Sequence, residues 1–177
     1  RSQGTLGRPP VLDVDGPDPT VLYEDGAYHL YTTNVYDSSG WVNVPHYRST
    51  DLQHWSQEAD ALPAPGPWAS TTSGYVWAPS VQRFGSTWVL YYTARVRDDA
   101  GWAARRQCIG RAVASSPDGP FVDSSATPLV CQIFQGGSID PDAFVAPDGS
   151  AWLLVKNDGN CCALPVSLWA VPLTADG

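Results

Sequence analysis

The sequence predicts an all-β protein, a β-propeller of which this chain forms about three blades. Three similar stretches recur at intervals of about 60 residues, with prolines at positions 19, 79 and 141. Each stretch is followed by a short apolar strand, a turn with glycine and an aromatic-rich strand, an order and period typical of propeller blades. No window shows a sustained period of 3.6 residues, so we expect no long helix. The stretches are Asp18-Pro19-Thr20-Val21, Trp77-Ala78-Pro79-Ser80-Val81 and Ile139-Asp140-Pro141-Asp142-Ala143-Phe144.

Each blade is expected to begin at one of these stretches, after an irregular lead-in over residues 1–17. The blade units are then residues 18–77, 78–139 and 140–177. Runs of β-branched and aromatic residues, bounded by Gly, Pro, Asp and Ser, predict three strands in each unit. The first strands are expected at 20–24, 80–84 and 143–146, the second at 27–34, 87–95 and 151–157, and the third at 45–49, 108–114 and 166–172. A fourth, outer strand should follow a turn-rich segment in each blade.

The number of blades predicts that the chain is a fragment, or one piece of a cleaved protein whose remainder stays associated. Propellers close into rings of four to eight blades. Two and three-quarter blades would leave an open sheet edge and an exposed apolar face.

Composition excludes several partners. The 177 residues contain 18 Asp and Glu against 10 Lys and Arg, with an isoelectric point near 4.5. An acidic surface argues against nucleic acids and anionic membranes, because both repel negative charge. No apolar run reaches the ~18 residues that a membrane-spanning helix needs.

Four cysteines give information about the compartment. Cys108 and Cys131 bracket the outer half of one blade, which favours a disulfide and an oxidising environment over two buried thiols. The adjacent Cys161 and Cys162 either close on each other or pair with segments outside this chain. None of the four shows the spacing of a zinc finger.

Two acidic residues occupy equivalent places in the repeat. Asp18 and Asp140 both precede the proline that begins an inner strand, so both should project into one mouth of the central channel. The proline fixes φ and with it the entry angle of the strand. A single Asp-Pro pair often does no more than begin a turn. Two in register favour a pair of carboxylates about 10 Å or less apart, the arrangement that glycoside hydrolysis uses.

These stretches, together with Ser49-Thr50-Asp51-Leu52-Gln53-His54-Trp55, resemble the N-terminal part of glycoside hydrolase family 43. The resemblance covers residues 9–177. It implies a five-bladed propeller and inverting hydrolysis of arabinofuranosyl or xylosyl linkages in plant polysaccharides. It also implies a secreted enzyme.

The resemblance assigns roles residue by residue. Asp18 corresponds to the general base that activates water, and Asp140 to the carboxylate that orients the general acid and raises its pKa. Trp77 matches an aromatic residue that lines the sugar pocket. Asn34 and Ile139 fall where the family places other substrate-binding residues.

The general acid of the family has no counterpart here. It is a Glu at the start of a fourth blade, whereas the only glutamates of this chain, Glu24 and Glu58, lie in the first unit and begin no strand. The acid is therefore expected outside this chain, and the chain alone is expected to be inactive, because protonation of the leaving group needs a carboxylic acid with a raised pKa.

Two other functions stay open at this stage. One is a non-catalytic carbohydrate-binding propeller that kept the aromatic pocket; a downstream Glu-Ala-Pro or Glu-Gly-Pro at a fourth blade opening would separate it from an enzyme. The other is the retaining fructan-cleaving group, which is disfavoured because its Asn-Asp-Pro-Asn opening is absent. The sequence leaves open the sugar, the linkage, and exo or endo action.

The expected partners are an oligo- or polysaccharide substrate and the missing C-terminal blades. No cofactor is required, although a structural calcium ion in the channel stays open. The three histidines, His29, His46 and His54, have no Cys or Glu neighbours, so no metal site is predicted from them. Trp41 and Trp102 lie in polar loops and are further candidates for walls of sugar subsites.

Overall fold

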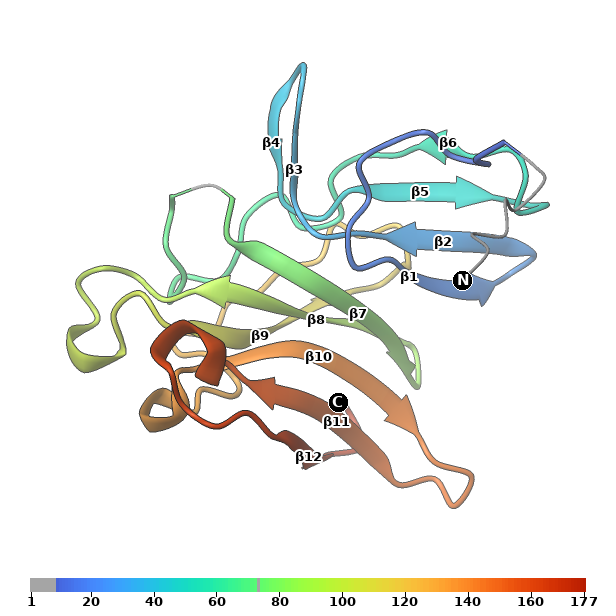
Figure 1. Ribbon diagram of the computed structural model, residues 1–177. Coiled ribbons are helices and arrows are strands. Elements are labelled where there is room, and N and C mark those ends of the chain that lie inside the picture. The colour runs from blue at the N-terminus through green and yellow to red at the C-terminus, as the bar shows by residue number, and fades with distance from the viewer. Residues whose placement is uncertain (1–8, 73) are drawn as a thin grey trace, which may run out of the picture.

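The computed structural model describes residues 9–72 and 74–177, and these consist almost entirely of antiparallel strands. Three sheets of three or four strands are arranged side by side like blades (Figure 1). Their first strands, β1, β7 and β10, contact one another in the order β1–β7–β10. This architecture confirms the predicted fold class, a partial β-propeller.

The first sheet has the order β1-β2-β5-β6 and the expected antiparallel pairing. Its strands are β1 (Thr20–Glu24), β2 (Ala27–Tyr31), β5 (His46–Ser49) and β6 (Ser56–Gln57). A two-residue turn, Asp25-Gly26, joins β1 to β2, and both residues have positive φ, 47° and 79°. Asp-Gly favours this turn because Gly adopts positive φ without a steric penalty and Asp tolerates it.

The second sheet, with the order β7-β8-β9, forms the middle of the molecule. β7 (Val76–Phe84) and β8 (Thr87–Arg95) are joined by a two-residue turn that begins with Gly85 at φ 60°, and β9 (Gln107–Ala114) pairs along the other edge of β8. β8 is buried along almost its whole length. Its sequence is largely apolar and aromatic, without strict alternation, because both faces of the strand are covered.

The third sheet has the order β10-β11-β12 and is covered on one face only. Its strands are β10 (Ser138–Val145), β11 (Ala151–Asn157) and β12 (Leu168–Leu173). No residue of β12 is buried, and Leu168 leaves 77% of its surface exposed. Apolar side chains of β12 therefore face solvent at this end of the row of sheets.

Two hydrophobic clusters join the three sheets. One contains Leu90 and Tyr92 of β8 and packs toward Tyr31 of the first sheet. The other contains Val89 and Tyr91 of β8 and packs toward the third sheet. Because successive side chains of a strand point to opposite faces, β8 contributes alternately to both clusters.

The first strands of the second and third sheets are longer than predicted. β7 begins at Val76 and β10 at Ser138, and each ladder shifts register at the proline, between Trp77 and Ser80 and between Ile139 and Asp142. A bulge at the proline therefore lets the strand pair with its neighbour both before and after that residue. The sequence pattern had placed the start of each strand at the proline.

Three features of the connections were not predicted. Residues 35–42 form a hairpin of β3 (Val35–Asp37) and β4 (Gly40–Val42) where a loop was expected. Short 3-10 turns occur at η1 (Gly101–Ala103), η2 (Ile133–Gln135) and η3 (Gly159–Cys162). In the described part of the second sheet, the expected fourth strand is reduced to two isolated bridges to β9, between Val113 and Val122 and between Ile109 and Val130.

Both cysteine pairs are disulfides. Cys108 and Cys131 are bridged as predicted, with Cα atoms 4.8 Å apart. Cys161 and Cys162 close on each other within η3, which resolves the two alternatives left by the sequence. Within the described ranges, no helix is long and apolar enough to span a bilayer.

Candidate active site

Asp18 precedes β1 and is held by a hydroxyl from the next strand. Thr33, just beyond β2, donates a hydrogen bond from Oγ1 to Asp18 Oδ2 at 2.6 Å. The same hydroxyl accepts the backbone N–H of Ala78 at 2.7 Å. Thr33 therefore links the openings of the first and second sheets. Only one carboxylate oxygen of Asp18 is engaged in this bond, and the residue is solvent-exposed.

The three blade openings share an unusual backbone conformation. Asp18, Ala78 and Asp140, each directly before a proline, have φ values of 51°, 45° and 55°. Left-handed backbone costs a non-glycine residue roughly 1–2 kcal/mol, and strain of this kind concentrates at functional sites. The repeat therefore turns the side chain before each proline out of the strand ladder in the same way.

Asp140 is positioned by the second sheet. Its backbone N–H donates to Thr93 Oγ1 of β8 at 3.2 Å, which repeats the contact between Ala78 and Thr33. Thr33 and Thr93 were missed in the sequence analysis. Both lie two residues after a tyrosine of the second strand, Tyr31 or Tyr91, and this shared spacing is the signal that could have identified them.

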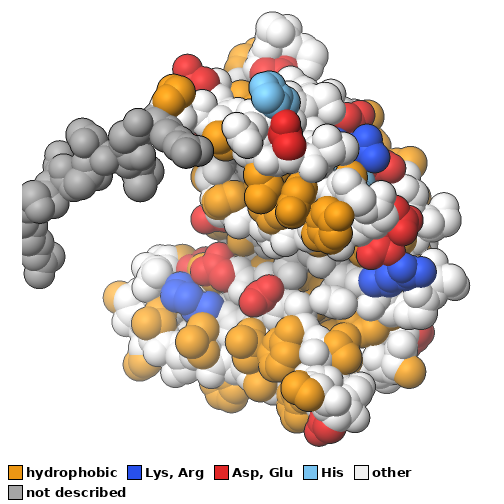
Figure 2. All heavy atoms as spheres, turned by 90° about the vertical axis from the view of Figure 1, so that its right-hand side faces the viewer, with side chains coloured by type: hydrophobic (Ala, Val, Ile, Leu, Met, Phe, Trp, Pro, Cys, Tyr) orange, Lys and Arg blue, Asp and Glu red, His pale blue; other side chains and the backbone are white. Residues whose placement is uncertain are grey.

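Asp18 and Asp140 are close enough to interact electrostatically. The pKa of Asp140 is raised, chiefly by partial burial, and the charges of Asp18 and Asp158 raise it further, while Lys156 lowers it. Lys156 pairs with Ile139 across β10 and β11, directly beside Asp140. Figure 2 shows acidic side chains gathered beside a basic one in a hollow between the upper and lower halves of the molecule.

The other predicted substrate-binding residues differ in exposure. Trp77 is half-buried next to Ala78, and its ring centroid lies 6.2 Å from that of Tyr75. Asn34 accepts the N–H of Val76 through Oδ1 at 3.2 Å, so its amide oxygen connects the first and second sheets. Ile139 is 9% exposed.

A cavity of about 760 Å³ is lined by residues of the first and second blade units, among them Val76, the residue before Trp77. Its lining includes Trp41 from the β3–β4 hairpin, Tyr75 and Arg95, and does not include Asp18 or Asp140. The Arg95 guanidinium lies 4.6 Å from the centre of the Tyr75 ring. Trp41 and Tyr75 give this cavity aromatic walls, and sugars stack on such walls; the side chain of Trp102 lies outside the described part of the structure.

The two glutamates are both remote from Asp18. Glu24 lies at the far end of β1, about 20 Å along the strand at ~3.3 Å per residue, and pairs with Arg83. Glu58 directly follows β6, at the edge of the first sheet opposite β1, and accepts a hydrogen bond from Ser56 at 2.7 Å. In the part of the chain that the structure describes, no glutamate therefore faces the space between Asp18 and Asp140.

Replacing Ala78 with Gly should stabilise the fold. Glycine removes the ~1–2 kcal/mol cost of left-handed backbone, and its greater freedom in the unfolded chain offsets about 0.5–1 kcal/mol of that gain. We expect a net gain of up to ~1 kcal/mol in urea unfolding of the natural full-length protein. Ala94→Gly, inside the buried strand β8, is the matched control and should destabilise; a loss of stability in Ala78→Gly would contradict the strain argument.

Sequence comparisons identify the same family as the motifs of the blade openings. The family model for glycosyl hydrolases family 43 matches residues 8–177. The chain is 24% identical over 144 residues to the extracellular endo-α-(1→5)-L-arabinanase 1 of Bacillus subtilis (strain 168), covering 77% of this chain and 41% of that protein.

Solved structures show the same fold. The endo-arabinase of Bacteroides thetaiotaomicron VPI-5482 superposes with a TM-score of 0.75 at 21% identity, over 94% of this chain and 54% of that one. A GH43_1 enzyme from Xanthomonas citri in complex with xylotriose gives a TM-score of 0.64 at 25% identity, over 82% of this chain and 41% of that one. The chain thus spans about half the length of these relatives.

Proposed function

The chain belongs to glycosyl hydrolases family 43, and on that premise we propose that it forms the base side of a glycosidase active site. The reaction is hydrolysis of arabinofuranosyl or xylosyl linkages in plant polysaccharides with inversion at the anomeric carbon. The general acid, a Glu, lies outside residues 1–177. The observation that supports this most directly is the pair of equivalent blade openings, where Asp18 and Asp140 share one backbone conformation and the charge of Asp18 raises the pKa of Asp140.

Asp18 is the general base in this proposal. The Thr33 hydroxyl holds Oδ2 and leaves Oδ1 open toward solvent. Oδ1 accepts a proton from the water that attacks the anomeric carbon, on the face opposite the leaving group. The rigid proline-bounded backbone keeps this oxygen in place, which a general base needs in order to remain within hydrogen-bond reach of its water.

Asp140 is a positioning carboxylate in this proposal. Partial burial and the charge of Asp18 both raise its pKa, while Lys156 opposes them, so its charge is sensitive to its neighbours. A carboxylate beside the general acid disfavours ionisation of that acid and so raises its pKa. The acid then remains protonated until the leaving oxygen needs the proton.

Trp77 forms one wall of the proposed sugar subsite, and Asn34, which accepts the backbone N–H of Val76, and Ile139 are its other lining residues. The cavity lined by Trp41, Tyr75 and Val76 accommodates further sugar units of a polymer. Arabinan and xylan are the favoured substrates, because relatives include an arabinanase and an enzyme solved with xylotriose.

Location and partners complete the proposal. The protein acts outside the cell, as the extracellular arabinanase does, and its two disulfides suit an oxidising environment. The remaining propeller blades are its protein partner, either in the same chain or as a separate piece. The reaction needs no cofactor, and a calcium ion in the channel would have a structural role only.

The test uses the natural full-length protein and aryl α-L-arabinofuranosides, aryl β-D-xylosides, arabinan and xylan. We expect hydrolysis of at least one pentoside, with a first-formed sugar of inverted configuration seen by NMR. Retention of configuration would overturn the roles given to Asp18 and Asp140. Binding of the polysaccharide without hydrolysis would instead establish the non-catalytic carbohydrate-binding propeller.

A further inference from the structure

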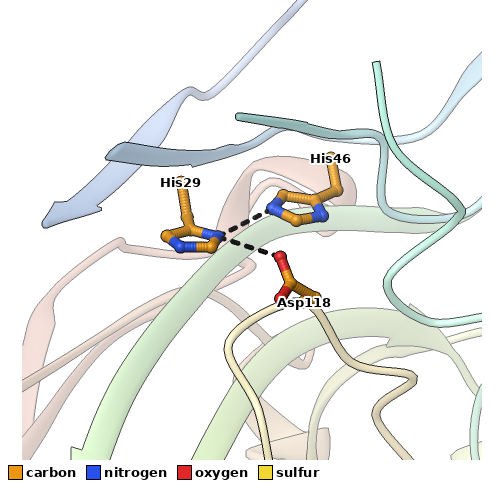
Figure 3. A group of neighbouring side chains, drawn as sticks. All are labelled: His29, His46 and Asp118. Atoms are coloured by element: carbon orange, nitrogen blue, oxygen red, sulfur yellow. Dashed lines mark hydrogen bonds and ion pairs between the residues drawn. The ribbon is translucent and has the colours of Figure 1, made fainter. Parts of the chain in front are cut away.

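Two histidines and an aspartate meet at the boundary between the first and second sheets (Figure 3). His29 lies on β2, His46 on β5, and Asp118 in the loop after β9. His29 Nδ1 is 3.1 Å from His46 Nε2 and 3.4 Å from Asp118 Oδ1. All three atoms lie within 4.8 Å of one another. The cluster is thus built from residues of two blades and includes neither Asp18 nor Asp140.

A hydrogen-bond arrangement alone leaves this cluster poorly satisfied. A single proton on His29 Nδ1 would be shared between His46 Nε2 and Asp118 Oδ1, which lie in its reach on different sides (Figure 3). A cation between the three atoms would be bound by all of them at once.

The donor set and its spacing fit a transition metal. Both imidazole rings are buried, and His29 Nδ1 lies beside His46 Nε2, so each ring can offer a nitrogen lone pair at this point. Tetrahedral zinc ligands lie about 2.0–2.1 Å from the metal, which places neighbouring donor atoms about 3.3–3.4 Å apart. Two of the three donor separations, 3.1 and 3.4 Å, are close to this spacing, and the third, between His46 Nε2 and Asp118, is no more than 4.8 Å.

The loop that carries Asp118 is held against the first sheet. The Tyr31 hydroxyl donates to the carbonyl of Pro117 at 2.5 Å, and the Tyr31 ring stacks on His46 with centroids 4.8 Å apart. Ser116 donates to Asp118 Oδ2 at 3.1 Å, which leaves Oδ1 for the cluster. The Asp118 side chain is 55% exposed, so water can reach the fourth coordination position from that side.

We propose that His29 Nδ1, His46 Nε2 and Asp118 Oδ1 form a site for a divalent first-row transition-metal cation, with zinc as the preferred ion. Two nitrogen donors and one oxygen donor favour zinc over calcium, which takes six to eight oxygen ligands. Bound there, the ion stabilises the contact between the first and second sheets. The proposal does not depend on the hydrolytic activity.

The test measures Zn²⁺ binding to the natural full-length protein after removal of metals by a chelator. Competition with a chromophoric chelator gives the number of sites and their affinity, and Co²⁺ substitution reports tetrahedral coordination by its visible absorption. Asp118→Asn and His29→Gln should each weaken one zinc equivalent at least ten-fold, with loss of the tetrahedral Co²⁺ spectrum.

His54→Gln is the matched control, because His54 is exposed and pairs with Asp51 alone at 2.7 Å. It should leave zinc binding unchanged. Circular dichroism of each variant ensures that a loss of binding is not a loss of fold, and Asp118→Asn alters an exposed side chain that the core does not need. If wild-type protein and Asp118→Asn bind zinc with the same stoichiometry and affinity, or if neither binds it at up to about 1 mM, the site does not exist.

Discussion

Asn in place of Asp18 is expected to lower kcat of the natural full-length protein on aryl pentosides at least ~1,000-fold. General base catalysis contributes roughly 10²–10⁴-fold, and the amide cannot accept the proton from water. The Thr33 hydroxyl can still donate to the amide oxygen, so the local backbone and the link to Ala78 persist. KM should therefore change only a few-fold, and the loss should appear in kcat.

The matched control is Asp25→Asn in the turn between β1 and β2. Asp25 also has positive φ, 47° against 51° for Asp18, so both substitutions place Asn in left-handed backbone, which it tolerates. Asp25 lies at the other end of β1 from the proposed site. Initial rates should be unchanged in Asp25→Asn; an Asp18→Asn protein with more than a tenth of wild-type kcat would remove Asp18 from the mechanism.

The strand core of the fold could be predicted because local signals agreed there. The predicted bounds 87–95 and 151–157 coincide with β8 and β11, where a glycine turn precedes each strand and an apolar run follows that turn. The first strands were cut short because Pro79 and Pro141 looked like strand starts. In the structure, a bulge carries each ladder past its proline, and a single sequence gives little sign of a bulge.

Contacts between blades were the least predictable part of the site. Asp18 and Asp140 were found from their register in the repeat, whereas Thr33 and Thr93 act through hydrogen bonds to the following sheet. The cluster of His29, His46 and Asp118 joins residues up to 89 positions apart, 118 minus 29, so no local spacing indicates it. Contacts between residues so distant in the sequence depend on how the sheets pack against one another. The sequence pattern within a single sheet does not reveal them.

Residues 1–177 expressed alone are expected to show no hydrolysis and to associate with themselves. The exposed face of the third sheet includes Leu168 and Trp169 of β12, and β12 is the edge strand among the described residues. On the first sheet, Val21 and Tyr23 of β1 are also exposed. Exposed apolar surface and unpaired strand groups drive association. Activity should be absent because neither Glu24 nor Glu58 is near Asp18.

The measurement compares residues 1–177 alone, the same residues mixed with the segment that follows them in the natural protein, and the continuous chain. Light scattering should show oligomers for the isolated piece and a defined species once the following blades cover β12. Hydrolysis of aryl pentosides should return in the mixture, and Asp18→Asn in residues 1–177 should abolish it there as well. That variant controls for contaminating glycosidases, since only an active site that uses Asp18 is sensitive to it. A monomeric, cooperatively folded and active 177-residue chain would show instead that three sheets suffice and that the proton donor is a residue of this chain other than its two glutamates.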